Sequence, residues 1–211
     1  MKISTHLFIE MKVKEFIDQN YSYNLGINVL CFGNVLADIS HLTAMHPHYH
    51  TKSINYIKNK IKSLCEYIPG LSDEFGIGYM LNLGVVTHYI CDFFCKAHAS
   101  NNIGSPKEHL KYEYTLRDYI EDNFEKFDDF DFMHGLKPAR SCDEIASQLD
   151  KWIKEYHLTE HNCEKDIIAA LRASCYITAS VMEICCERKR RILEMFLTAF
   201  AHPNPLTYQG H

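Results

Sequence analysis

Residues 84–98 read Gly84-Val85-Val86-Thr87-His88-Tyr89-Ile90-Cys91-Asp92-Phe93-Phe94-Cys95-Lys96-Ala97-His98, a mostly apolar run interrupted by His88 and Asp92. On a helix these two residues project from the same face, because they are four positions apart. A buried charge without a partner is costly, and a metal ion is a partner that uses both side chains. A second pair with the same spacing, His109 and Glu113, follows His98. The sequence therefore predicts two helices that form the walls of a metal site.

Composition limits the class of protein. The chain has 211 residues, of which 46% are hydrophobic and 23% charged, and this is typical of one globular domain spanning residues 1–211. Its net charge of −5, from 22 basic and 27 acidic residues, gives no support for a surface that binds polyanions. We therefore expect no nucleic-acid partner. The 13 histidines are many for this length.

The cysteines and the apolar runs indicate in which compartment of the cell the protein is expected. Nine cysteines cannot all pair, and their spacing resembles neither a disulfide framework nor a zinc knuckle, so we expect reduced thiols. The first ten residues lack an apolar core of signal-peptide length. No uninterrupted apolar run reaches the roughly 20 residues of a membrane span. We expect a cytoplasmic protein without a transmembrane segment.

The whole chain has the pattern of helices. Amphipathic period and cap residues predict helices, whereas the period-two alternation of strands is scarce. Ser105 with Pro106, and Ser141 with the acidic residues after it, are typical helix starts. We expect an all-α fold of six or seven helices in one bundle. The predicted helical segments are residues 5–18, 53–68, 74–97, 105–124, 141–156 and 164–199, and residues 26–40 form a further apolar segment.

Further candidate ligands lie near the ends of these helices: His6, Asp38, His98 and, in the segment 41–50, His46, His48 and His50. Histidine and carboxylate ligands without thiolate suit Zn²⁺, with Fe²⁺ or Mn²⁺ as alternatives. With one of the three loop histidines counted, eight ligands exceed the needs of one ion, so two or three clustered ions fit the number. Each residue alone also fits an ordinary structural role, such as a hydrogen-bonded core histidine, a surface ion pair or a helix cap. The joint pattern favours metal.

The order and spacing of these residues resemble a known family, the bacterial zinc-dependent phospholipases C, to which the clostridial α-toxin catalytic domain belongs. The resemblance covers roughly residues 1–120 and implies an all-α fold of the phospholipase C and P1 nuclease type. It rests on Thr5-His6, Asp38, His48-Tyr49, His88-Tyr89-x-x-Asp92, His98 and His109-x-x-x-Glu113.

The resemblance implies three metal positions. The first would be held by His98, His109 and Glu113. The second would be held by Asp38, a loop histidine, His88 and Asp92, and Asp92 would bridge to a third position bound by His6. For the loop histidine we prefer His48, which has the aromatic neighbour seen in the family, although His50 gives an equally acceptable gap from Asp38. Asp38 would also be the catalytic residue that orients or deprotonates the attacking water.

These features predict a metal-dependent phosphodiester hydrolase that acts on a phospholipid headgroup or a small phosphodiester. Three departures separate the chain from the secreted members. Met1-Lys2 stands near His6 where those members have a processed amino-terminal Trp, no membrane-binding β-domain follows, and no residues match the choline site. The alternatives are a single-strand nuclease of related fold, which the acidic balance disfavours, and a non-catalytic metal-binding protein.

Overall fold

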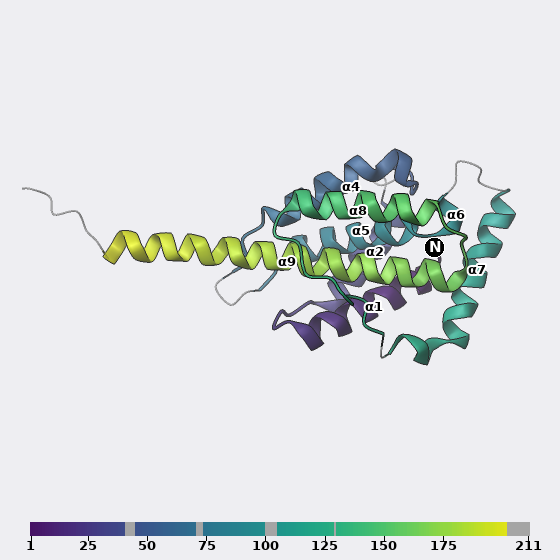
Figure 1. The fold of residues 1–211 in the computed structure, drawn as a ribbon, viewed down its shortest axis with the longest axis horizontal. Coiled ribbons are helices and arrows are strands. Elements are labelled where there is room, and N and C mark those ends of the chain that lie inside the picture. Colours follow the sequence, from purple (N-terminus) through teal and green to yellow (C-terminus); the bar gives the residue numbers. More distant parts are fainter. Residues whose placement is uncertain (41–44, 71–73, 100–104, 129, 202–211) are drawn as a thin grey trace, which may run out of the picture.

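The computed structural model describes residues 1–40, 45–70, 74–99, 105–128 and 130–201, and within these ranges the chain forms helices and no strand. The all-α prediction is confirmed. The described residues form seven long helices and the four-residue α6, and Figure 1 shows their arrangement. The helices are α1 (Ile3–Asn20), α2 (Ile27–Ile39), α4 (His50–Cys65), α5 (Ile77–Phe93), α6 (Lys96–Ala99), α7 (Pro106–Asp122), α8 (Cys142–His157) and α9 (Cys163–Ala201), with a 3-10 turn at Phe124–Phe127.

Helix α5 lies at the centre of the bundle and packs against α2, α4 and α9. Every residue from Leu83 to Phe93 is buried. A helix that is apolar on all sides is typical of such a position, since it has no face to present to water. The apolar residues of α5 bury the whole helix, and His88 and Asp92 are buried with them.

Helices α2 and α5 cross at two glycines. A Cβ atom on Gly84 would lie 2.2 Å from the carbonyl oxygen of Leu30, and one on Gly33 would lie 2.4 Å from that of Leu81. Only glycine allows the two backbones to approach this closely. The crossing places the second half of α2, which contains Asp38, beside His88.

The central helix is shorter than the sequence predicts. The pattern predicts one helix over 74–97, but α5 begins after Gly76 and ends at Phe93, the backbone of Phe94 leaves the helical conformation, and α6 begins at Lys96. The buried carboxylate of Asp166, in α9, accepts a hydrogen bond from the Lys96 amide at 2.7 Å. This acceptor satisfies an amide at the start of α6, so a second helix can begin there. His98 consequently turns towards α7.

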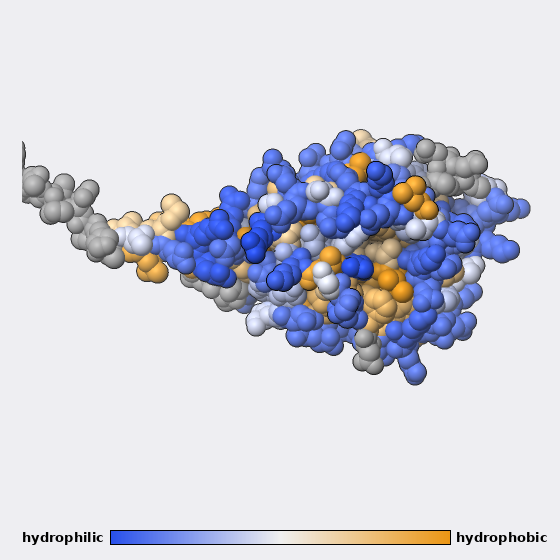
Figure 2. Space-filling view, viewed as in Figure 1, coloured by the Kyte–Doolittle hydropathy of each residue, from blue (hydrophilic) through white to orange (hydrophobic). Residues whose placement is uncertain are grey.

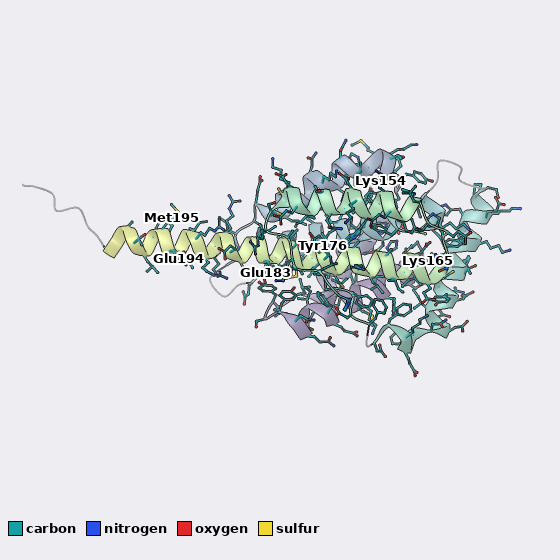
Figure 3. All side chains as sticks on the ribbon, viewed as in Figure 1. Lys154, Lys165, Tyr176, Glu183, Glu194 and Met195 are labelled. Carbon is teal, nitrogen blue, oxygen red and sulfur yellow. The ribbon has the colours of Figure 1, made fainter. Side chains whose placement is uncertain are left out.

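Helix α9 is the longest element, and its final part extends beyond the other helices (Figure 1). In Figure 3, Tyr176 and Lys165 lie on the part beside the bundle, whereas Glu194 and Met195 lie on the extension. By length and composition alone Cys163–Ala199 could cross a membrane, but 72% of its most apolar window is buried in the bundle. That burial is the pattern of a core helix.

Candidate metal centre

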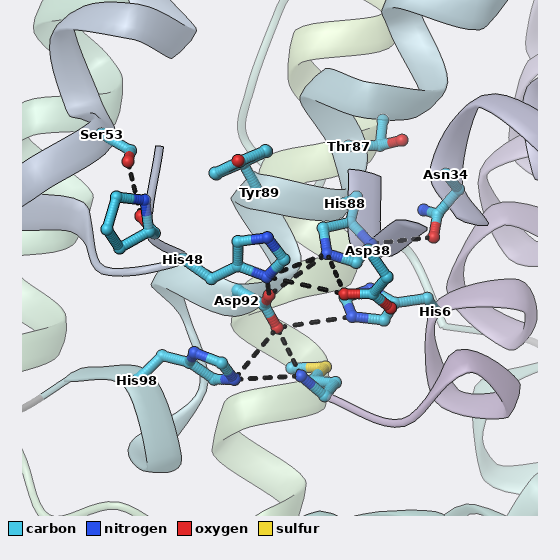
Figure 4. Close-up of polar contacts among 12 residues, drawn as sticks. His6, Asn34, Asp38, His48, Ser53, Thr87, His88, Tyr89, Asp92 and His98 are labelled. Atoms are coloured by element: carbon cyan, nitrogen blue, oxygen red, sulfur yellow. Dashed lines mark hydrogen bonds and ion pairs between the residues drawn. The ribbon is translucent and has the colours of Figure 1, made fainter. Parts of the chain in front are cut away.

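The eight residues predicted from the sequence to bind metal lie together in the structure. They come from α1, α2, the segment before α4, α5, α6 and α7, and Figure 4 labels six of them. Their ligand atoms form three groups, each with members within 4.8 Å of one another. The groups are Asp38, His48 and His88; His98, His109 and Glu113; and His6, His88 and Asp92.

The first group has the dimensions of a zinc site once Asp92 is included. The Nε2 atom of His88 lies 3.5 Å from Asp38 Oδ1, 3.4 Å from Asp92 Oδ2 and 3.3 Å from His48 Nδ1. His48 Nδ1 lies 2.9 Å from Asp92 Oδ2 and 3.7 Å from Asp38 Oδ1. Ligand atoms about 2.1 Å from a tetrahedral zinc ion lie about 3.4 Å from one another. The four side chains therefore fit one ion.

The second group joins α6 to α7. Glu113 Oε1 lies 3.0 Å from His109 Nε2 and 3.4 Å from His98 Nε2. Ser105 starts α7 with a capping box to Glu108, and this start places His109 and Glu113 on the face towards α6. Asp166 also accepts a hydrogen bond from the Tyr112 hydroxyl at 2.8 Å, so it ties both helices of this group to α9.

The third group centres on His6, whose two ring nitrogens are buried and make no hydrogen bond. Its ring stacks on that of His88 with centroids 4.0 Å apart, and its Nε2 lies 3.4 Å from Asp92 Oδ1. A buried imidazole without a hydrogen-bond partner is costly, and a metal ion would use its nitrogen. The residues present fit the zinc ions that the pattern implies.

Burial and neighbouring charges set protonation states that suit metal binding. Burial raises the pKa of Asp92, but His98 and the Met1 amino group outweigh it, so that this pKa lies well below its usual range. Glu113 behaves likewise, since hydrogen bonds from His109 and His98 outweigh burial and lower its pKa. Burial lowers the pKa of both His6 and His98. Ionised carboxylates and neutral imidazoles are the forms that bind metal.

His48 differs from these histidines. Burial lowers the pKa of His48. The hydrogen bond to Asp92 and the charges of Asp92 and Asp38 together outweigh burial, so the pKa is raised. A proton and a metal ion would therefore compete for its Nδ1 atom.

The amino group of Met1 lies between two of the groups. It is 2.5 Å from Asp92 Oδ1, 3.2 Å from Glu113 Oε1 and 3.2 Å from His98 Nε2. Burial alone would lower the pKa of this amino group, but Asp92 and Glu113 outweigh it and raise the pKa to about 11. The ammonium group balances part of the carboxylates' negative charge.

Two other candidate histidines lie elsewhere. His50 is the first residue of α4, and its Nδ1 lies 3.1 Å from His157 Nε2 at the end of α8. The ring of His46 stacks on Tyr56, and its carbonyl accepts a hydrogen bond from the Tyr89 hydroxyl at 2.6 Å. Of His46, His48 and His50, His48 is the one that lies with the other candidate ligands.

Sequence reasoning missed three buried polar residues around the centre: Glu10, Asn34 and Asp166. Glu10 is fully buried in α1, and burial raises its pKa to about 7. A signal for it was present, because His6 and Glu10 form a third pair four residues apart, like His88 with Asp92. No comparable pattern points to Asn34 or Asp166.

Comparison with known proteins also points to a metal centre. Residues 3–184 match the model of a family described as zinc-dependent phospholipase C. No curated protein and no solved structure gave a match. The match covers most of the chain, including all eight candidate ligands and the α8–α9 region beyond residue 120. On this evidence the chain belongs to the zinc-dependent phospholipase C family.

Proposed function

We propose that this protein is a phosphodiester hydrolase that binds two or three zinc ions through His6, Asp38, His48, His88, Asp92, His98, His109 and Glu113. Its substrate would be a phospholipid headgroup or a small phosphodiester. The main support is the position of Asp92, whose Oδ2 faces His48 and His88 while its Oδ1 faces His6 and His98. A carboxylate placed in this way serves a cluster of ions rather than a single one.

The side chains of the centre divide into buried and accessible ones. Asp92 is 1% exposed, whereas Asp38 is 33% exposed and His48 is 21% exposed. Bound zinc would lower the pKa of a water molecule and offset the charge that develops on the phosphate. Asp38 is the carboxylate of the first group that substrate and water can reach, so we assign it the role of orienting the attacking water or accepting its proton.

The charge of the chain favours a small ester over a nucleic acid as substrate. Proteins that bind single strands usually present a basic groove, whereas this chain has a net charge of −5. We therefore expect hydrolysis of a single phosphodiester without binding to a long polyanion.

The test combines elemental analysis with three substrates: a chromogenic phosphocholine ester, a bis-aryl phosphodiester and single-stranded DNA, each with and without a chelator. We expect at least two tightly held zinc ions per chain and turnover of one of the small esters that the chelator abolishes. Cleavage of DNA alone would instead identify a nuclease. Bound metal without turnover of any of the three would identify a non-catalytic metal protein.

A further inference from the structure

Glu10 is a buried carboxylate that lies one layer behind the metal centre. It is 0% exposed, on the face of α1 that packs against α2 and α5. Its Oε1 atom accepts a hydrogen bond from Asn34 Nδ2 at 2.9 Å and another from the Thr87 hydroxyl. A buried carboxylate is costly in an apolar core, so its presence calls for a reason beyond packing.

Asn34 connects Glu10 to a candidate ligand. Its Oδ1 atom lies 3.2 Å from Nδ1 of His88, as the dashed line in Figure 4 shows. When Glu10 is ionised, above its pKa of about 7, its carboxylate only accepts hydrogen bonds and must face the NH₂ group of the amide. The amide oxygen then faces His88. Because that oxygen also only accepts, the proton of the neutral imidazole must lie on Nδ1.

This proton position determines which nitrogen of His88 can bind metal. With Nδ1 protonated, Nε2 carries the lone pair, and Nε2 is the atom that faces Asp38, His48 and Asp92. With Glu10 ionised, the opposite amide orientation would place the amide oxygen against the carboxylate, two acceptors without a proton between them. Glu10 thus determines the orientation of Asn34, and Asn34 determines the tautomer of His88.

We propose that Glu10 is a positioning residue for the metal centre and acts through Asn34 to hold His88 with Nε2 towards the metal. The inference rests on the proposed function, since it presupposes a metal ion at the group of Asp38, His48, His88 and Asp92. Outer partners of this kind typically change metal affinity by about 10–100-fold. Glu10 contacts neither metal nor substrate.

The first variant is Glu10→Gln, which keeps the shape but replaces the carboxylate with an amide that can present either an oxygen or an NH₂ group to Asn34. We expect zinc affinity, measured by competition with a chromogenic chelator, to fall about 10–100-fold. The visible absorption spectrum of the Co²⁺-loaded protein should also change, since it reports the geometry of the ligands. Glu15→Gln, at an exposed position of the same helix, is the control for loss of one negative charge.

The second variant is Asn34→Leu, which removes the connection and keeps similar volume. If Glu10 acts through Asn34, Glu10→Gln should cause no further loss of zinc affinity in the Asn34→Leu background, as a double-mutant cycle measures. Additive losses would mean that Glu10 acts by another route and would overturn the inference. If Glu10→Gln does not fold, wild-type zinc affinity and Co²⁺ spectrum in Asn34→Leu would overturn it as well.

Metal binding by the wild-type protein distinguishes a failure of the proposed function from a failure of the role assigned to Glu10. If it binds no zinc or cobalt, the proposed function fails. If it binds both and Glu10→Gln binds them with unchanged affinity and spectrum, the proposed function stands and the role of Glu10 is refuted.

Discussion

At the scale of single residues, Asp92 differs from the other candidate ligands because its two oxygens face different partners. Oδ2 lies 2.9 Å from His48 and 3.4 Å from His88, whereas Oδ1 lies 3.4 Å from His6 and 3.5 Å from His98. Asp38 belongs to one group alone and is partly exposed. The two aspartates should therefore respond differently to the same substitution.

Asp92→Asn should lose metal and turnover together, because an amide supplies one oxygen where the cluster needs two. Asp38→Asn should weaken one group only. At saturating zinc its metal content should recover, while turnover stays about 10²–10⁴-fold lower, as for removal of a general base. Metal content by elemental analysis and hydrolysis of a soluble phosphodiester, both at several zinc concentrations, measure the two effects.

The control is Asp118→Asn, an exposed aspartate on α7 that pairs with Arg117. It should keep both metal and turnover. An Asp92→Asn protein with wild-type metal content and turnover would remove Asp92 from the centre.

Residue spacing in the sequence was enough to propose the ligands on helices, because a pair four positions apart shares a face whatever the tertiary fold. Spacing alone left His48 and His50 equivalent, since both stand at acceptable distances from Asp38 in the chain, and the preference for His48 came from the aromatic neighbour that the resemblance implies. The difference arises where α4 begins, at His50, which turns that side chain towards α8. Asn34 could not be found from the sequence, because its role depends on α1, α2 and α5 meeting.

At the scale of helices, the contact of α2 with α5 determines whether the first ligand group can form. Each helix contributes one glycine to the crossing, and Asn34 and Asp38 follow Gly33 on α2 while His88 follows Gly84 on α5. A wider crossing would move Asp38 and Asn34 away from His88. The sequence shows both glycines but not their contact, because an isolated glycine in a helix signals only a weaker helix.

Gly84→Ala should therefore disturb both stability and metal binding. The new Cβ would meet the carbonyl oxygen of Leu30 at 2.2 Å and the amide nitrogen of Asn34 at 2.7 Å, and backbone atoms cannot rotate away. We expect a cost of about 1–3 kcal/mol in the free energy of unfolding, as for an overpacked core. Zinc affinity at the first group should also fall. Denaturant unfolding and chelator competition measure the two effects.

Gly78→Ala is the matched control on the same helix, since nothing lies within 4 Å of the position its Cβ would take. It should be neutral or stabilise the protein by up to about 1 kcal/mol, because alanine favours helix. Equal behaviour of the two variants would contradict the close crossing.

The end of α5 also could not be predicted from sequence patterns. Residues 84–97 contain neither glycine nor proline after Gly84, so the pattern predicts an unbroken helix. The break at Phe94 and Cys95 depends on Asp166, about seventy positions later in the chain, which accepts the amide of Lys96. Here a tertiary hydrogen bond outweighs local helix propensity, and after the break in the helix His98 lies beside His109 and Glu113.

At the scale of the whole molecule, α9 has two parts with different surroundings. Leu171 is 0% exposed between the other helices, whereas Leu197 is 70% exposed on the extension. Figure 2 shows the apolar side chains of the extension on the surface, beyond a hydrophilic stretch of the same helix. The exposed side chains there include Leu193, Met195, Phe196 and Leu197. Of the two parts of α9, only the first should therefore contribute to the stability of the bundle.

Two leucine-to-alanine substitutions on α9 test this division with the same chemistry. Leu171→Ala should cost about 2–5 kcal/mol in the free energy of unfolding, because it leaves a cavity in the core. Leu197→Ala should change this free energy by no more than about 0.5 kcal/mol, as is usual at exposed positions. Zinc content should be unchanged in Leu197→Ala. A cost above about 1 kcal/mol for Leu197→Ala, growing with protein concentration, would instead mean that a second copy covers the extension in solution.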